Sequence, residues 1–398
     1  MKRIFLILKL FFKAKFIFKN PEKHELVIFD DVSLVDFKNF ISNYNYFVLQ
    51  NRLEKINEIY FSLKIIKLFI KNYNRNFMTA YLSSVLEIVN PKVVLTNIDN
   101  SLKFFDLAKI HSKKMIFMAI QNAARYDLKE NECLYNKKIL KHDINKKFFI
   151  PNFLCFGQFE IDEYKHYGIK VENFFKVGSL RLSNFLSYIK KNNLEIKKFK
   201  YDICLISESA HRRDKLFDEE IIEKNIAAIE KFTIKFCMDH NLKLIFAWRY
   251  NKKYQTKFYE REFNYYKKHL SKNELNYLMD NSLEKIKDGF TSYLAILQSK
   301  VVVGNRSTLL REKLAVGGKV LSFCYTSTNI WDFPVEGISS IKNCNYQEFE
   351  KRLLNICSMS EDDYFSKLEK NKNYTVEYDE KVSTAEIIKK KIDYFLSS

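Results

Sequence analysis

The segment with the strongest chemical signal spans residues 299–323 and reads SKVVVGNRSTLLREKLAVGGKVLSF. Its β-branched run, Val301–Val303, is typical of a strand that is buried on both faces. The next residues, Gly304–Asn305, predict a turn, and Ser307 or Thr308 can cap the helix expected to follow. Because the backbone N–H groups and the dipole at a helix start attract phosphate, this segment predicts a phosphate-binding site.

Charged side chains add a second function to the same segment. Arg306 and Arg311 flank the predicted helix start, and Glu312 lies one turn inside the helix. A carboxylate accepts hydrogen bonds from the hydroxyls of a ribose or a sugar, and guanidinium groups pair with phosphate. Gly317–Gly318 then ends the helix in the usual way. The pattern therefore predicts a site for a phosphate and for the hydroxyls of a ribose or a sugar, around Asn305 and the helix that follows it.

The elements that must position these residues alternate along the chain. Short apolar runs predict strands at 26–29, 46–49, 93–96, 115–119, 153–156, 174–177, 202–206, 243–247, 301–304 and 319–323. Patterns of helical period predict helices at 59–72, 76–88, 101–111, 159–167, 182–190, 218–240, 256–269, 290–298 and 307–315. Strands separated by helices indicate an α/β protein with doubly wound parallel sheets.

The length of 398 residues exceeds one ordinary core and predicts two domains. The charged stretch at 190–200 separates the two halves, so we expect Rossmann-like domains at 1–190 and 200–398. Ligands of such sheets bind beyond the carboxyl ends of the strands, which favours a site in the cleft between the domains. All eight glycines lie beyond residue 156. Since phosphate-binding loops need glycine, the second domain is predicted to bind the nucleotide and the first the acceptor.

The segment at 299–323 resembles the donor-binding half of GT-B glycosyltransferases and of their non-hydrolysing epimerase relatives. Proteins of bacterial surface-carbohydrate biosynthesis, including transferases of Kdo-like sugars and of polyol phosphates, are similar at three further places. These are IQNAAR (120–125), FGQFEIDEYKHYGI (156–169) and VGSLRLSNF (177–185). The resemblance implies that Ser307 and Thr308 bind the nucleotide diphosphate, that Glu312 binds hydroxyls, and that the nucleotide-sugar is a substrate and no cofactor is needed.

One departure from these relatives concerns the strand at 243–247. Many relatives carry a basic residue, His and Pro after it, whereas this chain has Ala247, Trp248, Arg249 and Tyr250. Arg249 can substitute for the basic residue in donor binding. After the strand at 202–206, Ser207 and Ser209 are placed to contact a phosphate or a sugar, although Ser209 is equally suited to cap a helix.

The acceptor-side candidates follow strands of the first half. Gln121, Asn122 and Arg125 come after the strand at 115–119, so their amides and guanidinium are placed to hold an acceptor. Gly178 and Arg181 follow the strand at 174–177 and are expected to line the hinge side of the cleft. The structural alternatives are a pair of loop amides, a solvated arginine and a simple turn at the glycine.

A catalytic base is not identified by any motif. An inverting transferase needs a carboxylate or a histidine near the acceptor hydroxyl, whereas a retaining one needs none. The candidates by position are Asp30, Asp31, His111, Asp127 and Glu160. Each alone is more often a structural or surface residue than a catalytic one. Asp30–Asp31 is not a DxD motif and no His/Cys cluster has ligand spacing, so no metal is expected.

The net charge of +19 and the pI near 9.3 predict attraction to polyanions. Lysines are scattered over the chain and no zinc-finger or RNP pattern occurs, which disfavours nucleic acid and leaves nucleotides or an anionic membrane. Seven cysteines without a CxxC pair indicate a reducing compartment. The N-terminal KRIFLILKLFFKAKFIFK (2–19) is interrupted by lysines, so it predicts either a basic helix on a membrane surface or a helix packed on its own domain.

These observations favour a cytoplasmic glycosyltransferase, peripheral at the inner membrane. It would move a sugar from a nucleotide-sugar to a glycan or glycolipid acceptor, such as a surface polysaccharide or lipopolysaccharide precursor. Two alternatives remain open. One is a nucleotide-sugar epimerase or a polyol-phosphate transferase on the same scaffold. The other is a non-catalytic binding protein that keeps the fold.

Overall fold

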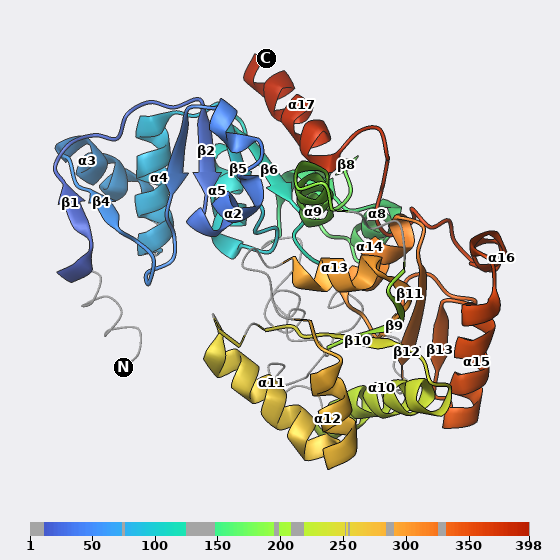
Figure 1. The fold of residues 1–398 in the computed structure, drawn as a ribbon. Coiled ribbons are helices and arrows are strands. Elements are labelled where there is room, and N and C mark those ends of the chain that lie inside the picture. The colour runs from blue at the N-terminus through green and yellow to red at the C-terminus, as the bar shows by residue number, and fades with distance from the viewer. Residues whose placement is uncertain are drawn as a thin grey trace.

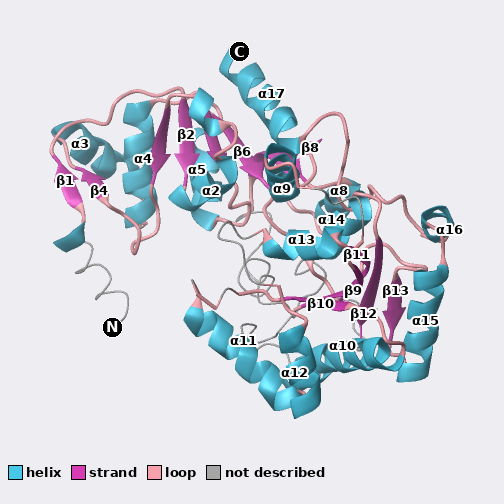
Figure 2. Ribbon diagram, in the orientation of Figure 1, coloured by secondary structure: helices cyan, strands magenta, loops and turns pink. Residues whose placement is uncertain are grey.

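Two all-parallel sheets form the framework of the protein (Figure 1). The computed structural model describes residues 12–73, 76–124, 148–194, 199–207, 219–250, 252–253, 255–283, 290–324 and 332–397. Helices surround the strands of each sheet, as the cyan and magenta elements of Figure 2 show. The predicted fold class, an α/β protein with two doubly wound Rossmann-like units, is confirmed.

The first sheet is six-stranded. Its order is β3 (Tyr46–Leu49), β2 (Leu26–Phe29), β5 (Val93–Thr96), β6 (Ile116–Ile120), β7 (Ile150–Cys155) and β8 (Val171–Lys176). The central strands β2 and β5 are buried along their whole length because both faces of the sheet are covered. One face packs on α4 (Phe77–Val89), α5 (Leu102–His111) and α8 (Gln158–His166). The other packs on α2 (Leu34–Phe37), α9 (Leu180–Lys191) and α17 (Thr384–Ser397).

The last helix, α17, returns from the second half of the chain to the first sheet. Its buried residues Ile388 and Ile392 belong to the same core cluster as Leu26 and Val93. Figure 1 shows α17 beside α9. The C-terminal helix α17 therefore packs with the first sheet. The domain boundary at 190–200 stays a prediction.

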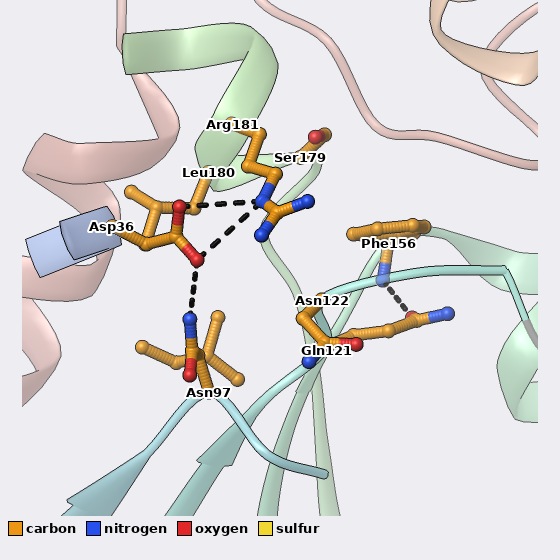
Figure 3. A pocket seen from close by; sticks show the side chains of 9 residues that line it. Asp36, Asn97, Gln121, Asn122, Phe156, Ser179, Leu180 and Arg181 are labelled. Atoms are coloured by element: carbon orange, nitrogen blue, oxygen red, sulfur yellow. Dashed lines mark hydrogen bonds and ion pairs between the residues drawn. The ribbon is translucent and has the colours of Figure 1, made fainter. Parts of the chain in front are cut away.

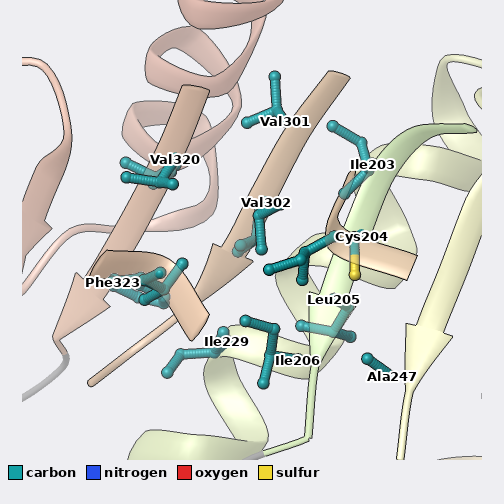
Figure 4. Close-up of a cluster of buried hydrophobic side chains, with 14 of the residues drawn as sticks. Ile203, Cys204, Leu205, Ile206, Ile229, Ala247, Val301, Val302, Val320 and Phe323 are labelled. Atoms are coloured by element: carbon teal, nitrogen blue, oxygen red, sulfur yellow. The ribbon is translucent and has the colours of Figure 1, made fainter. Parts of the chain in front are cut away.

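The second sheet is five-stranded. Its order is β10 (Leu244–Ala247), β9 (Tyr201–Ile206), β11 (Ser299–Gly304), β12 (Lys319–Cys324) and β13 (Ser340–Lys342). Around it lie α10 (Glu219–Asp239), α11 (Thr256–His269), α12 (Lys272–Asp280), α13 (Thr291–Leu297), α14 (Thr308–Ala315), α15 (Tyr346–Ser358) and α16 (Glu361–Ser366). Figure 4 shows aliphatic side chains of β9, β11 and β12 meeting in its core.

The structure corrects two sequence predictions near the N-terminus. The helix expected at 59–72 is α3 (Leu63–Asn72), because the residues before it form β4 (Glu58–Tyr60). This strand pairs with β1 (Lys15–Ile17), so the basic helix expected at 2–19 is wrong over its last residues. Residues 1–11 of that segment lie outside the described residues. Within the described part of the chain, no helix is both long enough and apolar enough to cross a membrane.

Candidate functional site

A small pocket lies at the carboxyl edge of the first sheet (Figure 3). Residues at or just after the ends of β5, β6, β7 and β8 line it, together with one residue from α2. They are Asp36, Asn97, Ile120, Gln121, Asn122, Phe156, Ser179, Leu180 and Arg181. This is the position that open parallel sheets use for ligands, because successive strands end there and their loops diverge.

A hydrogen-bonded trio forms one wall of this pocket. The Nε–H group of Arg181 donates to both carboxylate oxygens of Asp36, at 3.2 and 3.4 Å. The amide of Asn97 donates to the same carboxylate, and its own oxygen accepts from Ser33 at 2.7 Å. Asp36 is nearly buried, whereas 56% of the Arg181 side chain is exposed. The sequence did not single out Asp36, because its short helix has no recognisable pattern.

The opposite wall is built by Gln121, which the protein uses for its own structure. Its oxygen accepts from the backbone N–H of Phe156 at 2.8 Å. Its amide nitrogen donates to Ala123 at 3.0 Å and to Glu160 at 3.1 Å. With its polar atoms engaged and its side chain buried, Gln121 shapes the pocket more readily than it binds a ligand.

A fully buried ion pair joins the two halves of the chain. Arg311 of α14 donates to Glu160 of α8 at 2.7 Å, and both side chains are 2% exposed or less. The Arg311 guanidinium also lies 4.6 Å above the ring of Phe159. Burial raises the pKa of Glu160, and the charge of Arg311 opposes that shift. Because its carboxylate is paired in this way, Glu160 does not fit the role of a free catalytic base.

Glu312 forms a second contact between the halves. Its Oε1 accepts a hydrogen bond from Ser179, the N-cap of α9, and another from Tyr293 of α13 at 2.9 Å. The second oxygen is buried and has no hydrogen-bond partner among the described residues. Burial raises the pKa of Glu312 to about 7, although the hydroxyl donors lower it. The carboxylate expected to hold ligand hydroxyls is thus engaged by protein hydroxyls on one oxygen.

The predicted phosphate-binding helix start is present. Ser307 is the N-cap of α14, and its hydroxyl accepts from the Leu309 N–H group at 3.3 Å. The Thr308 hydroxyl accepts from the backbone N–H of Ala124 at 3.0 Å, in the loop that follows β6. The start of α14 therefore faces the carboxyl edge of the first sheet. The preceding Asn305 is buried and donates to Phe323 at 2.8 Å, which fixes the turn, and Arg306 is partly exposed beside it.

The other donor-side candidates lie at the ends of β9 and β10. Ser207 is buried and donates to Glu262 of α11, and its hydroxyl lies 2.5 Å from that of Tyr266. Glu262 also accepts the backbone N–H groups of Arg249 and Tyr250, both at 3.1 Å. The Arg249 side chain itself is exposed. Sequence reasoning missed Glu262, although it is a carboxylate on the apolar side of a helical pattern.

The remaining candidates do not converge on this pocket. Asp30, with a φ of 76°, pairs with Arg52 at 2.6 Å; burial acts to raise its pKa, but Arg52 lowers it overall. Burial raises the pKa of the neighbouring Asp31. His111 ends α5 at the opposite edge of the sheet, where it lies 2.6 Å from the Ser83 hydroxyl and burial lowers its pKa.

Three further candidates, Arg125, Asp127 and Ser209, lie outside the described residues. Gly178 has a structural explanation. Its φ is 81°, and an added Cβ would lie 2.2 Å from the backbone oxygen of Glu377. Among the described residues, no group of three or more His, Cys, Asp or Glu side chains is arranged to hold a metal ion.

Solved structures with the same arrangement of two sheets identify the fold. UDP-GlcNAc 2-epimerase of Methanocaldococcus jannaschii, in complex with UDP-GlcNAc and UDP, superposes with a TM-score of 0.53 at 14% identity, over 93% of this chain and 99% of that one. S. aureus MnaA with UDP gives 0.55 at 12% identity, over 94% and 97%. The fold is of the GT-B type. The wall teichoic acid polymerase TagF, as its H548A variant, gives 0.51 at 11% identity, over 94% and 90%.

These similarities extend over nearly the whole chain, so the GT-B fold includes both sheets. At 11–14% identity they show the fold alone. No protein-family model and no curated protein sequence matches the chain. Proteins with this fold include both epimerases and a polymerase, so the reaction must be argued from the residues of the site.

Proposed function

We propose that the protein is a glycosyltransferase that moves a sugar from a nucleotide-sugar to a surface polysaccharide or lipopolysaccharide precursor. One observation carries the proposal. The start of α14, with Ser307 and Thr308, lies at the carboxyl end of β11 and contacts the loop after β6, beside the pocket of the first sheet. A phosphate at this helix start would bring the group attached to it towards that pocket.

The roles follow from position and exposure. Ser307, Thr308 and the backbone at the start of α14 would bind the donor phosphates, with Arg306 and Arg249 supplying positive charge. The acceptor would bind at the carboxyl edge of the first sheet, where Asn122 and Arg181 line the pocket. Gln121, Glu160, Ser207 and Glu312 would hold these surfaces in place, since their side chains bond within the protein. No residue is assigned as the catalytic base.

Product analysis tests this proposal against its alternatives. The protein is incubated with UDP-, GDP-, CDP- and CMP-linked donors, with and without an extract of glycan precursors. A glycosyltransferase transfers the sugar only when an acceptor is present. An epimerase changes the donor without an acceptor, a polyol-phosphate transferase releases a nucleoside monophosphate from a CDP-polyol, and a binding protein gives no product. We expect sugar transfer that requires an acceptor. Any of the other results would contradict the proposal and favour the corresponding alternative.

We also propose that the first domain touches an anionic membrane through the tip formed by α3, β1 and β4 rather than through a helix at 2–19. Six large apolar side chains are exposed there: Phe18, Phe61, Leu63, Ile70, Tyr73 and Phe77, with exposed fractions of 47–87%. Lys64, Lys67 and Lys71 of α3 are exposed beside them. Figure 1 shows this tip at the end of the first sheet that is far from the second. An exposed apolar surface flanked by lysines matches the interface of an anionic bilayer.

Vesicle sedimentation tests the contact. The wild type is expected to bind phosphatidylglycerol vesicles more strongly than phosphatidylcholine vesicles, and added salt should weaken the binding. The double variant Leu63→Glu/Ile70→Glu should bind at least about tenfold more weakly, because two apolar contacts of roughly 1 kcal/mol each are lost. Met238→Glu/Leu354→Glu makes the same charge change on exposed residues of α10 and α15 and should bind like the wild type. Equal loss in both variants, or dimerisation through the α3 surface, would contradict the contact.

A further inference from the structure

The arginine in the pocket of the first sheet is held by only one of its three nitrogens. Among the described residues, Asp36 accepts from Nε, and no hydrogen bond engages Nη1 or Nη2. Figure 3 shows one of these terminal nitrogens directed towards the side of Ser179 and Phe156, and the other lying between Asp36 and Asn122. A guanidinium with its two terminal groups available presents a fork that fits two oxygens of one phosphate.

The neighbours of Arg181 keep this fork in place. Asp36 is itself fixed by the Asn97 amide and, through its backbone oxygen, by Asn184 at 2.8 Å. Asn97 is fixed in turn by Ser33. This chain of buried polar groups restricts the side chain of Arg181, so little rotamer entropy remains to be lost when a ligand binds. A solvated surface arginine has no such support.

The remaining lining of the pocket suits an anion. Arg181 is the second residue of α9, and the first residues of this helix line the pocket, so the positive end of the helix dipole lies beside it. The only carboxylate among the lining residues is that of Asp36, and its oxygens are already engaged by Arg181 and Asn97. The charge of a second carboxylate, Glu312, also acts on Arg181, and its Oε1 accepts hydrogen bonds from Ser179 and Tyr293.

We infer that this pocket binds a phosphate group through Arg181, with Asp36 and Asn97 as positioning residues. The inference rests on the proposed function, and it specifies the substrate class: the molecule that occupies the first domain carries a phosphate mono- or diester. The phosphate can belong to the acceptor or to the donor. The contact is bidentate, with Nη1 and Nη2 each donating to one phosphate oxygen.

A phosphorus-31 NMR titration of the full chain with inorganic phosphate, at constant ionic strength, tests the inference. The wild type should saturate, and Arg181→Gln should lower the affinity about tenfold or more, as expected for loss of a charge-assisted pair. Arg181→Lys keeps the charge without the fork and should fall between them. Arg52→Gln is the matched control, since Arg52 pairs with a buried aspartate at the same sheet edge but lies outside the pocket.

Two further measurements test the positioning role of Asp36 and show whether the phosphate belongs to the donor or to the acceptor. Asp36→Asn should weaken phosphate binding in the wild type but have no further effect in Arg181→Gln, whereas a purely structural role would weaken both equally. Saturating UDP should leave the titration unchanged if the phosphate is the acceptor's and abolish it if it is the donor's. A wild type that does not saturate, or an Arg181→Gln variant that binds like the wild type, overturns the inference. Failure of the proposed function would look different: phosphate would still bind, but nucleotide binding or sugar transfer would be absent.

Discussion

Replacing Arg311 with alanine is expected to lower the free energy of unfolding by roughly 3–5 kcal/mol, the cost of leaving one member of a buried ion pair without its partner. Arg311 is fully buried, and its loss would leave the Glu160 carboxylate with only the Gln121 amide as a hydrogen-bond donor among the described residues. The stacking of the guanidinium on Phe159 is lost as well. Urea unfolding followed by circular dichroism measures the effect.

The double variant Arg311→Met/Glu160→Met provides the control for this expectation. It removes both charges and fills the space with apolar side chains, so it should recover most of the lost stability. Glu160→Gln alone should be destabilising, since it leaves Arg311 buried with a neutral partner. If the double variant were as unstable as the sum of the single variants, the ion pair would not be the source of the effect.

The Glu312 contact between the domains is expected to make the stability of the protein depend on pH. Burial raises the pKa of Glu312 from the ordinary 4.5 to about 7 in the folded state. The folded protein therefore holds this proton more tightly than the unfolded chain does. Stability from this group is fully present below pH 4.5 and is lost as the pH rises through 7, by up to about 3 kcal/mol for a shift of this size.

Urea unfolding at a series of pH values between 4 and 8 checks this expectation. Glu312→Gln cannot ionise but keeps an acceptor oxygen for Ser179 and Tyr293, so the stability difference between this variant and the wild type should change across the window. As the pH rises, the free energy of unfolding of the variant should increase relative to that of the wild type. Glu260→Gln on the exposed side of α11 removes a carboxylate elsewhere and should keep the wild-type profile. Parallel profiles for wild type and Glu312→Gln would contradict a raised pKa in the interface.

Local signals predicted much of the framework. The run Val301–Val303 and the Ser307 cap are β11 and the start of α14, because a strand buried on both faces and a capped helix each leave a pattern in adjacent residues. The strand Val93–Thr96 was predicted at its observed bounds for the same reason. The alternation of strands and helices was enough to predict two doubly wound sheets.

Contacts between distant residues could not be predicted in this way. Glu160 and Arg311 are separated by 151 positions, and nothing near either residue indicates the other. The same holds for Asp36 and Arg181, which are 145 positions apart. Likewise, β1 and β4 are three-residue strands that are stable only as a pair, and the return of α17 to the first sheet depends on tertiary packing. A single sequence indicates candidate residues. Whether each one binds a ligand or stabilises the fold depends on its contacts with residues distant in the sequence.

Calorimetric titration shows whether a nucleotide-linked donor binds at the start of α14. UDP, GDP, CDP, CMP and their sugar conjugates are titrated into the wild type, Ser307→Ala and Ser271→Ala. Both variants lose a helix N-cap of similar worth, about 1 kcal/mol, but only Ser307 lies at the proposed site. We expect at least one nucleotide to bind the wild type, with affinity about tenfold weaker in Ser307→Ala and unchanged in Ser271→Ala. No binding by any member of the panel, or equal binding by all three proteins, would contradict it.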